Sequence, residues 1–167
     1  MMEAIAREAK VSLATVHLHF AGRIAVVGAL AEEIVAAPEL SVEQVTQDAD
    51  PVEQLRVGAH IMRQLNERAW LVADILRSQR GNDPDLERLW TLWRQRHLDA
   101  MRRAAEAIAS RGGLRPELNA ETAVDELYAL TGTEVYRALV LERGWTPERY
   151  ERWLFEVVCR EVLASHP

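Results

Sequence analysis

The chain has 167 residues, 49% of them hydrophobic, with 8 Gly, 6 Pro and a net charge of −6. That length suits one domain or a small head on a larger body, and the low Gly and Pro content leaves room for long helices. The negative charge argues against a general nucleic-acid coat, which needs a broad basic field, but a small DNA-reading face remains compatible with it.

The single cysteine, Cys159, excludes an internal disulfide and favours a reducing compartment. No apolar run approaches the ~18 residues of a membrane span. The residues after Met1 lack the basic and apolar regions of a signal peptide. We therefore expect a cytoplasmic protein.

Three short helices are expected at the N-terminal end, at 3–9, 13–20 and 23–36. Lys10 interrupts the first pair, and Ser12 is a good N-cap for the second helix. Gly22 marks the next break, and Pro38 ends the third helix. The polar stretch from Ser41 to Asp50 fits either a loop or the start of a short helix.

The rest of the chain is predicted to form four longer helices, near 51–79, 84–111, 120–143 and 147–164. Whether the first of these breaks near Asn66 stays open. Their expected caps are Asp50, Asp83, Asn119 and Thr146. The second has an apolar row at the helical period: Leu86, Trp90, Trp93, His97, Met101, Ala104 and Ile108. Because strand-like alternation is nowhere sustained, the chain is predicted to be all-α.

Residues 5–20 carry the most specific motif, two short helices joined by a three-residue turn. Small Ala6 and Ala9 would let the helices approach closely, and Val11 and Val16 would fill the gap between them. This is the packing of a helix-turn-helix, whose second helix is free to enter a major groove of DNA.

This segment resembles the head of TetR-family transcriptional regulators. The matching positions are Ile5, Ala6, Ala9, Val11, Ser12, Thr15, Val16, His19 and Phe20. The Gly-Gly-Leu-Arg-Pro-Glu-Leu run at 112–118 and the Trp-Thr-Pro-Glu-Arg-Tyr run at 145–150 are also similar to the family. The resemblance implies a DNA-binding head at 1–36 and a helical ligand-binding and dimerisation body at 37–167.

The head departs from the family pattern in several ways. The family's head opens with one further helix, which is absent ahead of Met2, so the head is expected to be incomplete and mobile or shielded by a neighbour. Lys10 stands where Gly is usual, and a positive φ there costs about 1 kcal/mol. His17 replaces a common Tyr. Residues 1–34 carry a net charge of −1, from Arg7, Lys10 and Arg23 against Glu3, Glu8, Glu32 and Glu33, so weak DNA binding is expected.

The DNA-binding candidates follow from the second helix of the motif. The apolar side chains of Leu13, Ala14 and Leu18 are suited to thymine methyl groups. Phosphate contacts are assigned to Thr15, His17, His19 and Arg23, with Ser12 as the cap. Thr15 and His19 could instead cap or pack locally. No metal site is expected at His17 and His19, because two residues on a helix are roughly 200° apart.

The resemblance implies an effector pocket inside the body and a dimer made by its last two helices. The pocket candidates are His60, Met62, Trp70, Trp93, His97, Met101, Tyr128 and Thr131, with ordinary core packing as the alternative. The dimer candidates are Val135, Leu139, Trp153 and Val157, with burial inside the protomer as the alternative.

The sequence and the resemblance together indicate a homodimeric transcriptional regulator, a repressor controlled by a small molecule and bound to a pseudo-palindromic operator. No cofactor is expected. No acid–base set or activated nucleophile converges, so an enzyme is not expected. The alternative is a helical small-molecule-binding or dimerisation module with a non-functional DNA head.

Overall fold

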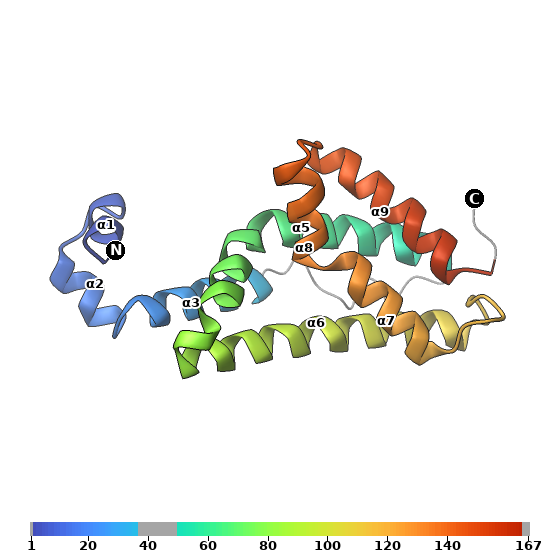
Figure 1. The fold of residues 1–167 in the computed structure, drawn as a ribbon, viewed down its shortest axis with the longest axis horizontal. Helices are drawn as coiled ribbons and strands as arrows, with labels where there is room; N and C mark the ends of the chain where they lie inside the picture. Colours follow the sequence, from blue (N-terminus) through green and yellow to red (C-terminus); the bar gives the residue numbers. More distant parts are fainter. Residues whose placement is uncertain (1, 37–49, 165–167) are drawn as a thin grey trace.

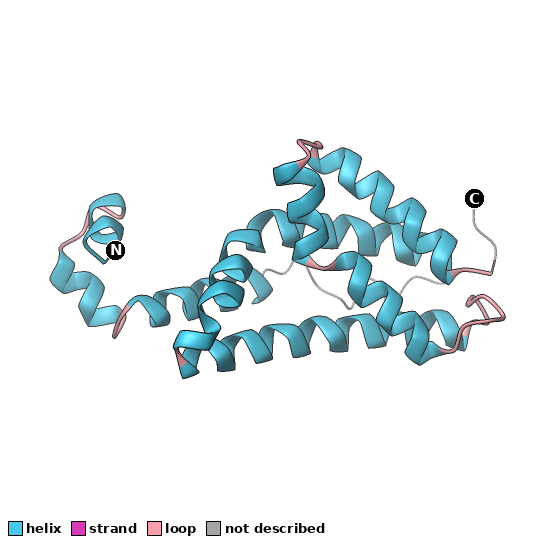
Figure 2. Cartoon of the chain, in the orientation of Figure 1, coloured by secondary structure: helices cyan, strands magenta, loops and turns pink. Residues whose placement is uncertain are grey.

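The computed structural model describes residues 2–36 and 50–164. All regular elements among these residues are helices (Figure 2). The β-type pairing in the described residues is limited to an isolated bridge between Leu114 and Leu163. The predicted all-α fold is confirmed. The expectations for Pro38 and for 41–49 lie outside the described residues.

The helices run along a long molecule, with one end formed by the first two (Figure 1). The head contains α1 (Met2–Glu8), α2 (Leu13–His19) and α3 (Arg23–Ala36). The body contains α5 (Pro51–Gln79), η2 (Arg80–Asn82), α6 (Pro84–Ser110), α7 (Ala120–Thr131), α8 (Thr133–Tyr136), the π-helical segment η3 (Arg137–Glu142) and α9 (Pro147–Val162).

The predicted N-caps close the helices as expected. Each cap side chain accepts a backbone N–H from the first turn, at Ser12, Asp50, Asp83, Asn119 and Thr146. Helix α5 continues unbroken past Asn66, which settles the alternative that the sequence left open. Gly112, with a φ of 67°, follows the end of α6 as a left-handed stop.

The predicted single helix at 120–143 is wrong. Gly132, with φ −63° and ψ 153°, ends α7, and α8 then leads into a π-helical segment. The apolar period passes through this glycine, so the pattern alone predicts continuity. Contacts from α5 and α6 stabilise the break.

Two apolar clusters hold the molecule together. The larger lies between α5, α6, α7 and α9, where Ile108, Tyr150 and Leu154 are fully buried. The second joins α3 to α5 and α6 through Val27, Val72, Leu76, Leu86 and Trp90. The head is therefore attached to the body by α3, which packs on α5 and α6.

No single helix in the described chain is long and apolar enough to cross a membrane. Leu13–His19 and Arg23–Ile34 together satisfy that test by length and composition, but they bend by 64° at their junction.

Candidate functional site

The turn between α1 and α2 has the geometry that the motif predicts. Lys10 adopts a φ of 56°, so the positive φ expected there is present. The N–H of Val11 donates to the carbonyl of Ala6 at 3.0 Å, which closes the turn. Ala6 and Val16 are 5% and 4% exposed and form the contact between the helices. Val11 is 43% exposed, so its predicted role in filling the gap is wrong, and Ala9 is exposed too.

Helix α2 presents an apolar face to solvent. Leu18 is 82% exposed and Leu13 is 38% exposed, although both side chains are large and apolar. Ala14, His17 and His19 are also exposed, as is Arg23 at the start of α3. An exposed helix at one end of the molecule, with apolar groups on its surface, has the shape needed to enter a groove.

Ser12 and Thr15 act on the helix itself. The Ser12 hydroxyl accepts the Thr15 N–H at 3.0 Å, and the two hydroxyl oxygens lie 2.7 Å apart. Thr15 is half-buried. The local capping role that the sequence left as an alternative is therefore present, and it fixes the start of α2.

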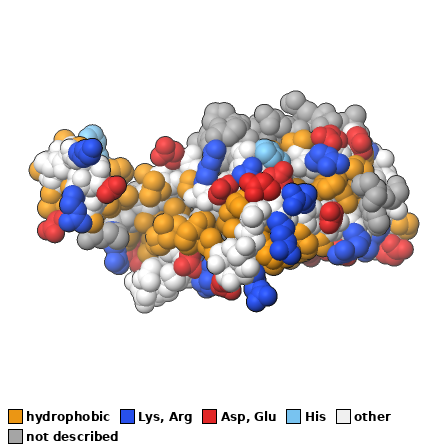
Figure 3. Space-filling view, turned by 90° about the horizontal axis from the view of Figure 1, so that it is seen from above, with side chains coloured by type: hydrophobic (Ala, Val, Ile, Leu, Met, Phe, Trp, Pro, Cys, Tyr) orange, Lys and Arg blue, Asp and Glu red, His pale blue; other side chains and the backbone are white. Residues whose placement is uncertain are grey.

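The head lacks a broad basic face on the side that Figure 3 shows, where side chains of both charges lie beside hydrophobic ones. Residues 1–34 hold three basic and four acidic residues, a net charge of −1. Long-range phosphate attraction is therefore weak, and short-range contacts from α2 must supply most of any DNA affinity.

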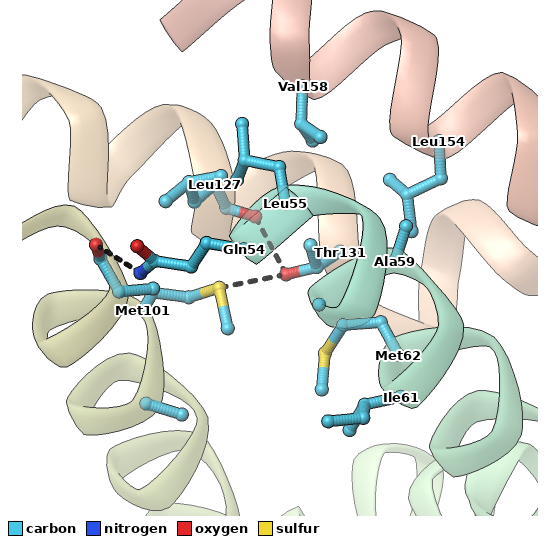
Figure 4. A pocket seen from close by; sticks show the side chains of 13 residues that line it. Gln54, Leu55, Ala59, Ile61, Met62, Met101, Leu127, Thr131, Leu154 and Val158 are labelled. Atoms are coloured by element: carbon cyan, nitrogen blue, oxygen red, sulfur yellow. Dashed lines mark hydrogen bonds between the residues drawn. The ribbon is translucent and has the colours of Figure 1, made fainter. Parts of the chain in front are cut away.

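A cavity of about 40 Å³ lies inside the body, between α5, α6, α7 and α9 (Figure 4). By volume it holds a few water-sized spheres, far less than the ~300–1,000 Å³ of a typical ligand site. Its lining consists of Gln54, Leu55, Gly58, Ala59, Ile61, Met62, Ala100, Met101, Ala104, Leu127, Thr131, Leu154 and Val158.

Thr131 links the cavity to a partly buried histidine. Its hydroxyl donates to the Leu127 carbonyl at 2.7 Å and lies 2.8 Å from Nε2 of His97. Because the hydroxyl proton points at the carbonyl, the His97 nitrogen is the donor in this pair. Burial lowers the pKa of His97 from its usual 6.5 to about 4, and the charge of Glu134 opposes this shift. His97 is therefore neutral near pH 7.

Asn66 stabilises the break between α7 and α8. Its Nδ2 donates to the Thr131 carbonyl at 3.0 Å and to the Tyr150 hydroxyl at 3.2 Å. The N–H of Val135, which would reach the Thr131 carbonyl in an unbroken α-helix, donates to Gly132 instead. A buried side chain of α5 thus satisfies the Thr131 carbonyl that the break exposes.

The predicted effector residues fall into three groups. Met62, Met101 and Thr131 line the cavity. His97 contacts Thr131, and the Tyr128 ring lies 4.6 Å from the His97 ring, centroid to centroid.

The remaining three effector candidates lie away from the cavity. Trp70 packs on the outside of the larger cluster, and Trp93 packs on the cluster that joins α3 to the body. His60 is exposed and pairs with Glu151 at 3.0 Å. The apolar period of α6 correctly predicts that Trp93 is packed. Trp93, however, lies near the part of α6 that contacts α3 and does not line the cavity.

Sequence reasoning missed most of the cavity lining. The missed residues include Gln54, Gly58, Ala59, Ala100 and Ala104. A usable signal was present, because small residues occur on both α5 and α6 at the level where the helices face each other. Small side chains leave space where two helices meet.

The dimer candidates differ in how much surface they offer. Val157 is buried in the core, while Val135, Leu139 and Trp153 are half-buried. The Trp153 ring lies 6.0 Å from the ring of Trp145, edge to face. The last helices therefore expose apolar surface through these half-buried residues and through Leu141, which is 43% exposed.

Cys159 lacks the environment of a nucleophile. The thiol is buried, and this burial raises its pKa to about 11. Among residues 2–36 and 50–164, no group of three or more His, Cys, Asp or Glu side chains could hold a metal ion.

This geometry defines an all-helical fold with a helix-turn-helix at one end and a larger helical body. Among solved structures, the chain is similar to the TetR-family transcriptional regulator PfmR from Thermus thermophilus, with a TM-score of 0.67 and 16% identity. The match covers 96% of this chain and 88% of PfmR.

A second similar structure is a protein from Saccharomonospora viridis, provisionally assigned as a transcriptional regulator and solved in complex with choline. Here the TM-score is 0.76 and the identity 19%, over 98% of this chain and 86% of that one. No protein-family model and no curated protein matches the sequence. The chain therefore has the TetR-type fold, which confirms the resemblance at the level of the fold.

Proposed function

We propose that this protein is a homodimeric DNA-binding transcription regulator, a repressor whose DNA binding is controlled by a small molecule in the body. The observation that carries the proposal is the exposed apolar face of α2, which stands at one end of the molecule behind a tight turn. Leu18 is 82% exposed, the highest value among the exposed large apolar side chains of the described residues, and burying it against a partner would be favourable.

The residues of the head divide by chemistry. Leu13, Ala14 and Leu18 would meet base edges and thymine methyl groups. His17, His19 and Arg23 would donate to phosphate oxygens and fix the register of the helix on the duplex. Ser12 and Thr15 keep the start of α2 in place through their mutual capping contacts.

The body would pass an effector signal to the head through α5 and α6. Both helices line the cavity, and both pack against α3 in the second apolar cluster. A molecule that separates α5 from α6 at the cavity would displace the surface on which α3 rests. Moving the population from 1:99 to 99:1 requires about 5.5 kcal/mol of preference for one state.

A homodimer would place two heads on successive major grooves, ~34–36 Å apart on a pseudo-palindromic operator. Val135, Leu139 and Trp153 are the interface residues that we propose, because they lie half-buried on the last helices. The buried Val157 would support this surface from behind. We further propose that the protein is cytoplasmic and is not an enzyme. The buried, protonated thiol of Cys159 supports the second point, because such a thiol is a poor nucleophile.

The second candidate is a helical ligand-binding or dimerisation module with a non-functional DNA head. The net charge of −1 over residues 1–34 favours it, because phosphate attraction drives most non-specific DNA affinity.

Selection from a random DNA pool separates the two candidates. The full chain is bound to the pool at low salt, and the retained DNA is sequenced. The regulator proposal expects enrichment of a pseudo-palindrome whose half-sites lie one helical turn apart. The same enrichment must weaken when Leu18→Asp replaces the wild type. A pool that stays random with folded protein would favour the module.

A further inference from the structure

The side chains that line the cavity restrict the class of ligand that the cavity can bind. Eleven of the thirteen lining residues are apolar or glycine, and the two polar ones are Gln54 and Thr131. None of the lining side chains is acidic or aromatic. A quaternary ammonium ion is bound in proteins by the faces of aromatic rings or by carboxylates. The cavity therefore offers a cation no compensation for the water it would lose.

The two polar side chains already have partners. Nε2 of Gln54 donates to the Ala104 carbonyl at 3.2 Å, and its Oε1 accepts from Nη1 of Arg111 at 2.9 Å. The Thr131 hydroxyl contacts the Leu127 carbonyl, Nε2 of His97 and, at 3.4 Å, the sulfur of Met101. A ligand that needs strong hydrogen bonds would have to break these contacts, and an apolar ligand leaves them intact.

The cavity can also grow. It lies where Gly58 and Ala59 of α5 face Ala100 and Ala104 of α6, so few side-chain atoms separate the helices. In Figure 4 the side chains of Met62 and Met101 extend toward the space between the helices. Methionine has three rotatable bonds and fills irregular gaps, so rotation of these two side chains enlarges the site. Rotation of Met62 breaks no hydrogen bond of the lining, and rotation of Met101 breaks only the 3.4 Å contact from the Thr131 hydroxyl to its sulfur.

We infer that the body cavity binds a small, uncharged, apolar molecule and rejects a cation of the same shape. The class of ligand is inferred from the cavity alone. The role of that ligand as an effector rests on the proposed function. The inferred ligand class separates this chain from its structural neighbour, which was solved in complex with choline.

Methionine methyl NMR tests this assignment on the full chain. The chain has four methionines, of which Met62 and Met101 line the cavity and Met2 lies in α1 as an internal control. The protein is titrated with choline and, separately, with its uncharged carbon analogue dimethylbutanol, in which a carbon atom replaces the quaternary nitrogen. We expect dimethylbutanol to shift Met62 and Met101, to leave Met2 unchanged, and to bind at least ~tenfold more tightly than choline.

Two cavity variants with opposite expected effects locate the binding. Ala104→Leu fills the space and should abolish the shift of Met62. Met62→Ala enlarges the space and should tighten dimethylbutanol binding several-fold, with Met101 as the remaining probe. Ala129→Leu, at an exposed position on α7, is the matched control and should bind as the wild type does.

Three results would overturn the inference: choline binding as tightly as its analogue, neither compound shifting Met62 or Met101, or unchanged binding in both cavity variants. The DNA selection is run without ligand, so its outcome is independent. Dimethylbutanol bound in the cavity of a protein that selects no DNA would leave the ligand class intact and defeat the regulator proposal.

Discussion

The head and the body of this molecule are stabilised in different ways. In α1 and α2 only Ala6 and Val16 are buried, and the two helices are held by a closed turn and by the Ser12 cap. The body has a core of twenty buried residues supported by a polar network at Asn66 and Thr131. A surface that binds a partner can remain exposed only if the rest of the protein is stable without the contacts of that surface.

This comparison also distinguishes what can change in each region. Local changes within α1 and α2 should affect the stability of the body little, because α3 is the helix of the head that packs closely on α5 and α6. The body contains the cavity, the kinked α7–α8 junction and the candidate dimer surface in one connected core. Changes in the body should therefore be global, and changes in the head should be local.

The largest expected effect is at the centre of the body. Ile108→Ala should lower the free energy of unfolding by about 2–5 kcal/mol, because a fully buried side chain is removed from a packed core. Urea unfolding measures this change. Leu92→Ala, at a half-exposed position on the same helix, is the control and should change it by less than ~0.5 kcal/mol. Equal effects at the two positions would contradict the assigned core.

The buried imidazole makes the body sensitive to acid. Because the pKa of His97 is about 4 in the folded protein and about 6.5 when unfolded, the unfolded state takes up the proton first. The stabilisation is present above pH 6.5 and is lost as the pH falls toward 4, by roughly 2–4 kcal/mol. Chemical unfolding of the wild type and His97→Leu across this range measures it. The variant should lose less stability, and parallel pH profiles would count against a buried neutral His97.

The polar network around Asn66, at the break between α7 and α8, should contribute nearly as much to the free energy of unfolding. Asn66→Ala leaves the Thr131 carbonyl and the Tyr150 hydroxyl without their donor, and should cost about 2–3 kcal/mol of unfolding free energy. Tyr150→Phe keeps the bond to Thr131 and should cost only about 1 kcal/mol. If the order of the two variants were reversed, Asn66 would not be the group that stabilises the break.

The smallest effect should be confined to the head. Ser12→Ala removes the cap of α2 and should cost about 1 kcal/mol locally. Hydrogen exchange should show faster exchange at α2 amides and unchanged exchange in α6. Ser110→Ala, at the exposed end of α6, is a control that leaves α2 unaffected. Altered exchange in α6, or unchanged exchange in α2, would break the separation between the regions.

Much of the fold could be predicted because its signals are local. The Ser12 and Asn119 caps and the positive φ at Lys10 depend on neighbouring residues in the chain, and all are present. The break at Gly132 could not be predicted, because its stabilising partner Asn66 lies on another helix. A periodic pattern describes a helix surface and carries no record of such distant contacts.

The candidate site was predictable only in part for a related reason. The exposed set on α2 follows from the motif, and Leu13 and Leu18 are exposed. The cavity follows from missing volume, which Gly58 and Ala104 create jointly from two helices. Large aromatic residues such as Trp93 attract attention in a sequence, yet they fill space and do not create it.

The affinity of α2 variants for the selected DNA tests the central claim most directly. Leu18→Asp should weaken binding by at least ~tenfold, since a carboxylate would face phosphates and base edges, and it should leave urea unfolding unchanged. Leu71→Asp places the same change on an exposed leucine of the body and should bind DNA as the wild type does. Equal DNA affinity of both variants and the wild type would contradict the assignment of α2 as the helix that reads DNA.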